Sequence, residues 1–231
     1  MFRAFITRGF CVNIDSGYFD HDYYEKGKLS GKSLYENYRW LPELTLPLAQ
    51  EIIQKIEAIS NQGNKKKYNI LDFGCAKGFL VQAFRQLGHN AYGVDISNYA
   101  IQNSHTNARP FLSLISNTLK IPVDWPKFDW VIAKDVLEHI QPNELFSYLC
   151  DLRKISSNIL VIVPLGNGSR YYIEDYELDL SHYIREDLDW WINILAAAGF
   201  STTGTYQVGE LKSSWVGFHP KGNGLLMSVK S

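Results

Sequence analysis

Residues 70–78, Ile-Leu-Asp-Phe-Gly-Cys-Ala-Lys-Gly, constrain the fold of this 231-residue chain more than any other stretch. An apolar run ends in Asp72, and Gly74 and Gly78 mark a tight turn. Apolar residues then recur at helical spacing over residues 80–87. A strand, a glycine turn and a helix in this order aim backbone N–H groups and a positive helix end at a ligand. The stretch predicts a nucleotide-like cofactor at a turn that needs glycine for close approach or positive φ.

The chain from Tyr68 onward alternates between strand and helix signals, which predicts right-handed crossovers and a parallel sheet covered on both faces. Two further strand-like segments have no helix between them and predict an antiparallel hairpin at one edge. We therefore expect an α/β, Rossmann-like, seven-stranded and mostly parallel sheet with an antiparallel edge hairpin and helices on both faces. The predicted strands are 68–73, 90–95, 111–116, 128–133, 158–163, 202–208 and 224–230, and the predicted helices are 77–88, 97–106, 141–156 and 186–198.

The part of the chain before this alternation is rich in aromatic residues and reads as irregular over residues 1–45. A helix is predicted over residues 47–60, because apolar residues share one face and Pro47 suits the first turn. We expect a single domain over residues 1–231, with residues 1–46 forming an N-terminal cap segment on a core of residues 47–231.

Composition narrows the possible partners and the compartment. The net charge is −1, and no segment gathers the Lys and Arg expected of a nucleic-acid surface, so no nucleic-acid partner is expected. The N-terminus is too polar for a signal peptide, and no apolar run approaches the ~18 residues of a membrane span. Three cysteines show neither metal-ligand spacing nor a disulfide pattern. We expect a cytoplasmic protein with no membrane span and no metal site.

The spacing of the glycines separates two kinds of nucleotide site. A dinucleotide turn needs G-x-G-x-x-G, and its second and third glycines would here fall on Ala76 and Phe79. The pattern present is D-x-G-x-x-x-G, from Asp72 through Gly74 to Gly78. It resembles the first motif of class I S-adenosylmethionine-dependent methyltransferases, and Ala76 departs from the glycine that is commoner in the middle of that motif.

The resemblance extends over roughly residues 47–208. Asp95 ends the second predicted strand 21 residues after Gly74, where a carboxylate accepts hydrogen bonds from ribose hydroxyls. Asn117 stands where the family usually has an Asp for the adenine amino group. Residues 128–140, Phe-Asp-Trp-Val-Ile-Ala-Lys-Asp-Val-Leu-Glu-His-Ile, are similar to the fourth-strand signature of small-molecule methyltransferases of the ubiquinone-biosynthesis type.

The resemblance implies S-adenosyl-L-methionine as cofactor and S-adenosyl-L-homocysteine as product. It places the cofactor near the switch between the first two strands, with the acceptor above the fourth and fifth, covered by the N-terminal segment and by residues 165–185. The cofactor residues that it implies are Asp72, Gly74, Cys75, Ala76, Gly78, Asp95, Ile96, Asn117, Thr118, Lys134 and Asp135. Arg39 is a further candidate, which we read either as a partner of the cofactor's carboxylate or as a surface residue.

Members of this class share no universal catalytic residue, because the methyl donor is already activated. If a general base is used, His182 is the first candidate, followed by His139, Asp135 and Glu174; each histidine can equally brace its own loop. The expected reaction is in-line methyl transfer to a small or medium-sized acceptor: a metabolite, a sugar or glycan unit, or a lipid-soluble ring. A non-catalytic cofactor-binding scaffold is the alternative, and a protein substrate stays open, as does the oligomeric state.

Overall fold

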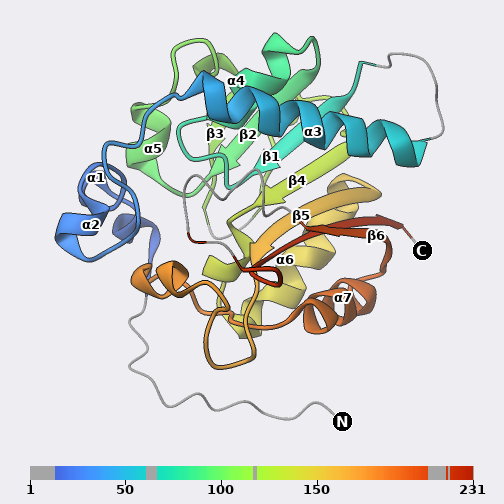
Figure 1. The fold of residues 1–231 in the computed structure, drawn as a ribbon. Coiled ribbons are helices and arrows are strands. Elements are labelled where there is room, and N and C mark those ends of the chain that lie inside the picture. The colour runs from blue at the N-terminus through green and yellow to red at the C-terminus, as the bar shows by residue number, and fades with distance from the viewer. Residues whose placement is uncertain (1–13, 61–66, 117–118, 208–216, 218, 231) are drawn as a thin grey trace.

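The computed structural model describes residues 14–60, 67–116, 119–207, 217 and 219–230 (Figure 1). Within these residues a seven-stranded sheet has the order β3-β2-β1-β4-β5-β7-β6. The first five strands pair in parallel, whereas β7 is antiparallel to both β5 and β6. The predicted fold class is confirmed. The strands are β1 (Asn69–Phe73), β2 (Asn90–Asp95), β3 (Leu112–Leu114), β4 (Trp130–Lys134), β5 (Asn158–Pro164), β6 (Phe200–Gln207) and β7 (Asn223–Lys230).

Helices cover both faces of the sheet (Figure 1). The helices α3 and α4 pack on one face, where Ile52 and Phe84 are fully buried. The helices α6 and α7 pack on the other, around the fully buried Leu149 and Trp191. Because the central strands β4 and β5 are buried on both sides, they read as nearly continuous apolar runs. The helices are α3 (Pro42–Ser60), α4 (Phe79–Gln86), α5 (Asn98–Gln102), α6 (Pro142–Ile155) and α7 (Leu188–Ala197).

Helix α3 begins five residues earlier than predicted. Pro42 occupies its first position, and the carbonyl of Leu41 accepts the N–H of Thr45 at 2.9 Å. Pro47 therefore lies inside the helix, where it lacks one backbone donor. Proline favours the first turn of a helix, and both Pro42 and Pro47 satisfy this rule. The prediction placed the start at Pro47, whereas the helix begins at Pro42.

The N-terminal segment is more regular than predicted. It contains the short helices η1 (Ser16–Tyr18), α1 (His21–Glu25) and α2 (Gly27–Ser30). The Asp20 side chain caps α1 by accepting the backbone N–H of Tyr23 at 3.0 Å. Tyr23 and Tyr24 are buried against Ala76 of the glycine turn and Ala100 of α5. We call residues 14–38 the cap.

The order of the strands corrects the predicted position of the topological switch. The chain goes from β1 to β2 on one side and later returns to β4 on the other side of β1. The switch therefore lies between β1 and β4, and the crevice expected of such folds opens at the carboxyl ends of these two strands. Short turns lie near this edge: η3 (Leu137–His139) follows β4, η4 (Glu174–Leu178) lies in the connection after β5, and η2 (Arg109–Phe111) precedes β3.

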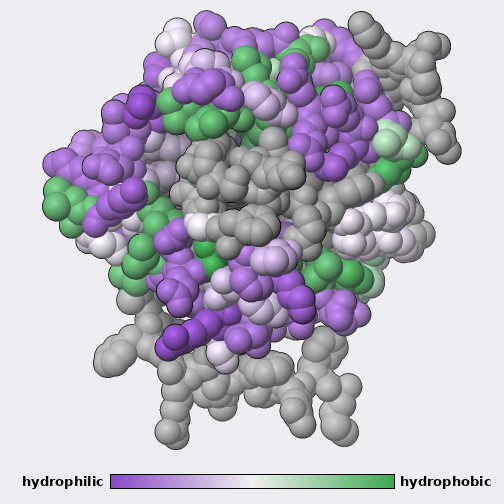
Figure 2. All heavy atoms as spheres, in the orientation of Figure 1, coloured by the Kyte–Doolittle hydropathy of each residue, from purple (hydrophilic) through white to green (hydrophobic). Residues whose placement is uncertain are grey.

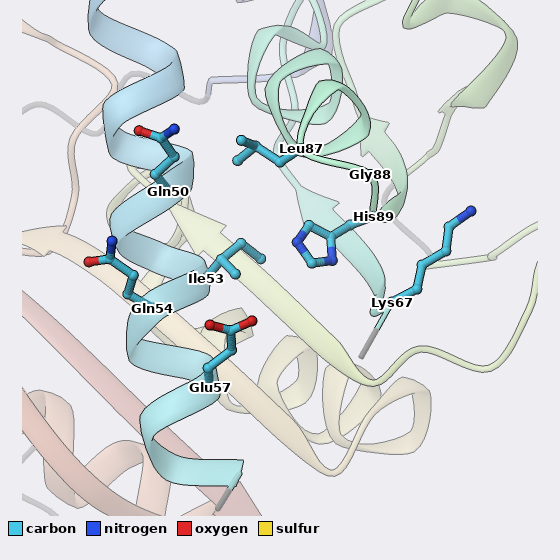
Figure 3. A pocket seen from close by; sticks show the side chains of 8 residues that line it. All are labelled: Gln50, Ile53, Gln54, Glu57, Lys67, Leu87, Gly88 and His89. Carbon is cyan, nitrogen blue, oxygen red and sulfur yellow. The ribbon is translucent and has the colours of Figure 1, made fainter. Parts of the chain in front are cut away.

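A groove of about 480 Å³ lies at the opposite end of the sheet (Figure 3). Its lining includes Gln50 and Glu57 of α3, together with His89, which immediately precedes β2. The groove is therefore separate from the carboxyl ends of the strands. The face shown in Figure 2 is mostly hydrophilic, with apolar residues in small patches. Among the described helices, none has the length and apolar character needed to cross a bilayer.

Candidate cofactor and acceptor site

The glycine turn after β1 has the backbone conformation that its sequence predicts. Gly74 and Gly78 have φ of +80° and +74°. A Cβ on Gly74 would lie 2.3 Å from Cγ2 of Val136, so the close neighbour is the segment after β4. Ala76, the departure from the family pattern, also adopts a positive φ of +47°, which costs a residue with a Cβ about 1 kcal/mol or more. The turn is therefore held in place despite a local backbone cost.

Cys75 contributes its backbone to this turn. Its N–H donates to the carbonyl of Val94 at 3.0 Å, next to the Gly74 N–H, which donates to the same oxygen at 2.9 Å. The thiol is buried, and burial raises its pKa. Cys75 therefore anchors the turn to β2 and holds an unreactive thiol.

Asp95 lies where the first two predicted motifs meet. It ends β2, and one carboxylate oxygen accepts the N–H of Ala76 at 2.7 Å, while the other accepts the N–H of Ser97 at 2.7 Å. Burial raises the pKa of the Asp95 carboxyl, and these backbone donors partly offset the effect. Ile96 follows, half-buried against the core. The predicted ribose-binding acid and the predicted glycine turn are thus in direct contact.

Asp72, at the switch between β1 and β4, is a buried acid. It is 4% exposed, and burial raises the pKa of its carboxyl to about 7; the positive charge of Lys134 lowers the pKa, and Asp95 raises it. Lys134 ends β4 and forms an ion pair at 2.5 Å with Asp135, which has a positive φ of +50°. The structure therefore brings these three predicted residues to one edge of the sheet.

The cap closes over this edge. Lys77 of the glycine turn forms a buried ion pair with Glu25 of α1 and donates to the carbonyl of Tyr38 at 2.8 Å. Burial, followed by the negative charges of Asp72 and Asp95, raises the pKa of Tyr38. Of the other predicted cofactor residues, Arg39 is exposed, and Asn117 and Thr118 lie outside the described residues.

The two candidate histidines lie together beside the cap. The ring centroids of His139 and His182 are 4.6 Å apart, and Phe19 of the cap packs edge-on against His139 at 5.8 Å. Burial lowers the pKa of His139, and the charges of Asp179 and Asp135 raise it in part. Burial, followed by His139, lowers the pKa of His182 to about 3. Both rings are therefore neutral at pH 7.

In the long connection, Glu174 is the remaining candidate base, and Tyr171 packs against His182 with ring centroids 5.4 Å apart. Glu174 is exposed on η4. Tyr171 is buried, and its hydroxyl donates to the carbonyl of Ile184 at 2.7 Å, so it braces the connection. Tyr172 stacks on His219 with ring centroids 5.2 Å apart.

Three polar residues that were not predicted as site residues form a hydrogen-bonded chain that reaches His139: Tyr23, Asp179 and Ser181. Asp179 accepts hydrogen bonds from the Tyr23 hydroxyl at 2.8 Å and from the Ser181 hydroxyl at 2.5 Å. Ser181 in turn lies 2.7 Å from Nδ1 of His139. The one local signal is the spacing Asp179-Leu-Ser181, in which an Asp binds the backbone two residues on.

Glu138 is also buried at this point. One ligand-type atom from each of Glu138, His139 and His182 lies within 4.8 Å of the others. Carboxylate and imidazole atoms of this kind suit either a divalent cation or the proton of a bound molecule. The sequence-based expectation of no metal site stays a prediction.

Known proteins resemble this sequence and this fold. A family model described as "Methyltransferase domain" matches residues 45–203. The ubiquinone biosynthesis O-methyltransferase of Rhodopseudomonas palustris strain BisA53 is 29% identical over 102 residues, which are 43% of this chain and 40% of that protein. The mitochondrial ubiquinone biosynthesis O-methyltransferase of Mus musculus is 29% identical over 117 residues, 47% of this chain and 32% of that protein. The matches thus span less than half the length of these curated relatives.

Two solved structures share the fold. Magnesium protoporphyrin IX methyltransferase of Synechocystis PCC 6803, with bound S-adenosylhomocysteine, has a TM-score of 0.58 and 18% identity over 91% of this chain and 98% of its own. The 1,6-didemethyltoxoflavin-N1-methyltransferase of Burkholderia thailandensis, with S-adenosylhomocysteine and 1,6-didemethyltoxoflavin, has a TM-score of 0.57 and 15% identity over 81% of this chain and 78% of its own.

The fold, the glycine turn and the acid at the end of β2 define a class I S-adenosylmethionine-dependent methyltransferase. Because the family model covers more than half of the sequence, the chain belongs to the methyltransferase domain family. The predicted family is confirmed.

Proposed function

We propose that this chain binds S-adenosyl-L-methionine at the carboxyl ends of β1, β2 and β4 and transfers its methyl group to a hydroxyl group of a small or medium-sized acceptor. One observation carries the cofactor assignment: the carboxylate of Asp95 touches the glycine turn, 2.7 Å from the N–H of Ala76. An acid and a turn with left-handed backbone, meeting at a strand end, fit a ribose beside a methionine moiety. The curated O-methyltransferase relatives support an oxygen acceptor.

Bound S-adenosylmethionine supplies a methyl group on a positively charged sulfur, so the chain's own residues have to position the acceptor, exclude water and remove its proton. The cap is placed to exclude water, because its Tyr24 and Tyr38 pack in one apolar cluster with Ala76 of the glycine turn, whose N–H Asp95 accepts. The connection over residues 165–185 contacts the cap through Asp179 and closes the acceptor side.

We assign the general base to His139, although the sequence ranked His182 first. His182 is 7% exposed and has a pKa of about 3, so it is a poor proton acceptor near neutral pH. His139 is half-buried, lies directly after β4 and receives the favourable charge of Asp179. The acceptor's O–H bond breaks with its proton passing to His139, its O–CH₃ bond forms, and the electron pair of the methyl–sulfur bond stays on sulfur.

The test of the cofactor assignment is calorimetric titration with S-adenosylhomocysteine. We expect micromolar binding by the wild type, at least tenfold weaker binding by Asp95→Ala, and no binding of NAD. Asp151→Ala, on the exposed face of α6, is the matched control and is expected to bind as the wild type does. Thermal unfolding of each variant verifies that it is folded. A folded wild type that binds no S-adenosylhomocysteine would contradict the proposal and favour the non-catalytic scaffold.

We further propose that the described residues act as one unit with the cap as part of it, and that the protein works in the cytoplasm. Two described cysteines, Cys75 and Cys150, are free thiols, which fits a reducing compartment.

A further inference from the structure

We propose that Asp179 and Ser181 are positioning residues that fix the proton of His139 on Nδ1, so that Nε2 faces the acceptor as the free base nitrogen. The three residues are called the relay below. This inference rests on the proposed methyl transfer and adds to it two residues that the sequence did not predict as site residues. It also ties the N-terminal cap to the base.

The direction of each hydrogen bond follows from counting hydrogens. The Ser181 hydroxyl has a single hydrogen, which it donates to Asp179 at 2.5 Å. Its oxygen is then left as an acceptor, and it lies 2.7 Å from Nδ1 of His139. Nδ1 must therefore carry the hydrogen of the neutral ring. The other ring nitrogen, Nε2, keeps its lone pair.

The carboxylate of Asp179 is fixed by three donors. The hydroxyl and the backbone N–H of Ser181 both bind one of its oxygens, at 2.5 and 2.9 Å. The Tyr23 hydroxyl binds the other oxygen at 2.8 Å. Asp179, Ser181 and Tyr23 are all buried, and a buried serine hydroxyl held by a carboxylate has no freedom to turn its hydrogen toward the histidine.

The link to Tyr23 gives the relay a dependence on the cap. Tyr23 lies in α1 and packs on Phe19, whose ring touches the edge of His139. When the cap is closed, Asp179 has its full set of donors and the ring of His139 is enclosed. The base is therefore complete in the closed state, in which water is excluded from the acceptor.

We do not assign the role of general base to His182, whose ring is held by other partners. Nδ1 of His182 lies 3.0 Å from the carbonyl of Tyr176, which can only accept, so this ring also has its hydrogen on Nδ1. Its Nε2 lies 3.9 Å from the carboxylate of Asp179, beyond hydrogen-bond distance. Two neutral rings beside buried Glu138 are also compatible with a cation, and the experiment below distinguishes a base from a ligand.

The experiment is a two-bond ¹H–¹⁵N spectrum of the full chain labelled with ¹⁵N-histidine at pH 7.5, which distinguishes a protonated ring nitrogen from one with a lone pair. Spectra of His139→Gln and His182→Gln assign the signals. We expect Nδ1 of His139 to be protonated in the wild type and the signal to move toward the Nε2–H form in Ser181→Ala. Ser181→Thr keeps the hydroxyl and should restore the wild-type pattern. Ser156→Ala removes an equally buried hydroxyl that bonds the Asp129 carbonyl, and it should leave His139 unchanged.

Two results would overturn the relay. The first is a spectrum that contradicts the expected tautomer: either His139 of the wild type is protonated on Nε2, or the Ser181→Ala spectrum is identical to that of the wild type. The other is micromolar binding of Zn²⁺ or Mg²⁺ that shifts Nε2 of both histidines, which would make these nitrogens ligands instead of bases. Calorimetry of S-adenosylhomocysteine with Ser181→Ala separates this failure from that of the proposed function. The variant is expected to bind within about twofold of the wild type, since the relay does not contact the glycine turn.

Discussion

Ala76 is the residue at which this chain departs most clearly from the pattern that its motifs resemble. Its backbone has φ of +47°, and its N–H is held by Asp95. A Cβ makes this conformation unfavourable, whereas glycine adopts it freely. The turn keeps its shape because the backbone N–H groups of Gly74, Cys75 and Ala76 all donate hydrogen bonds to β2, which compensates for the local cost.

We therefore expect Ala76→Gly to stabilise the protein by about 0.5–1 kcal/mol, because relief of the left-handed backbone outweighs the added freedom of the unfolded chain. The measurement is the free energy of unfolding from urea denaturation. Ala196→Gly, at an exposed position of α7, is the matched control and should destabilise by a similar amount. Equal destabilisation by both substitutions would show that the turn is not strained at Ala76.

The buried acid Asp72 makes stability depend on pH. Its carboxyl has a pKa of about 7 in the folded protein, against an ordinary value of 3.8. Between these two values the folded state binds more protons than the unfolded state, so this group's contribution to the free energy of unfolding falls as pH rises and is lowest above pH 7.

Asp72→Asn should remove this dependence. We expect its stability relative to the wild type to rise from pH 5 to pH 8, with a gain on the order of 2–4 kcal/mol at pH 8, since tenfold in proton affinity corresponds to about 1.4 kcal/mol. Thermal unfolding of both proteins across this range is the measurement. A constant difference between the two curves would mean that Lys134 holds the carboxyl ionised throughout.

At the scale of elements, the ion pair of buried Lys77 is one of the contacts that attach the cap to the core. Lys77 is 8% exposed, and its ammonium contacts Glu25 of α1. Tyr99 of α5 donates to the same carboxylate at 3.0 Å. Removing one member of such a pair leaves the other charge buried and unbalanced, which costs about 3–5 kcal/mol.

A double-mutant cycle tests this attachment. We expect Glu25→Gln to loosen the cap strongly and Glu25→Gln with Lys77→Met to loosen it less, because the double variant buries no unbalanced charge. Limited proteolysis of the cap at 25 °C is the measurement, and Lys28→Met with Glu36→Gln, an exposed pair 3.9 Å apart, is the control. Additive effects of the two core substitutions would show that the pair does not hold the cap.

The accuracy with which the sequence predicts the structure also differs between the strands, the helices and the relay. The strands β1, β2 and β5 were predicted within one residue, and for β5 the reason is an uninterrupted apolar run buried on both faces. The start of α3 was missed because two prolines gave the same signal. The relay was missed because it depends on tertiary contacts: Tyr23 and Asp179 are 156 residues apart, and His139 and Ser181 are 42 apart. Local spacing carries no information on such pairs.

At the scale of the whole molecule, the cap lies over the predicted cofactor site in this structure (Figure 1). The cap therefore has to open for a ligand to enter beside Asp95, and a bound ligand gives the closed cap a further contact. We expect saturating S-adenosylhomocysteine to slow hydrogen exchange in α1 and α2 at least tenfold more than in α7. Helix α7 is the reference because it packs on the face of the sheet opposite to α3 and α4. Equal slowing in all three helices would indicate a ligand that stabilises the whole fold without engaging the cap.

The position of β7 has a consequence for how the chain is made. This strand lies between β5 and β6, pairing with β5 from Asn158 to Pro164 and with β6 from Phe200 to Gln207. During translation, β5 and β6 are complete before β7 has left the ribosome. Until residues 223–230 emerge, the fully buried strand β5 presents an open, apolar edge to other chains. We therefore expect productive synthesis of this protein to depend on shielding that edge until β7 pairs with it, a task suited to a nascent-chain chaperone.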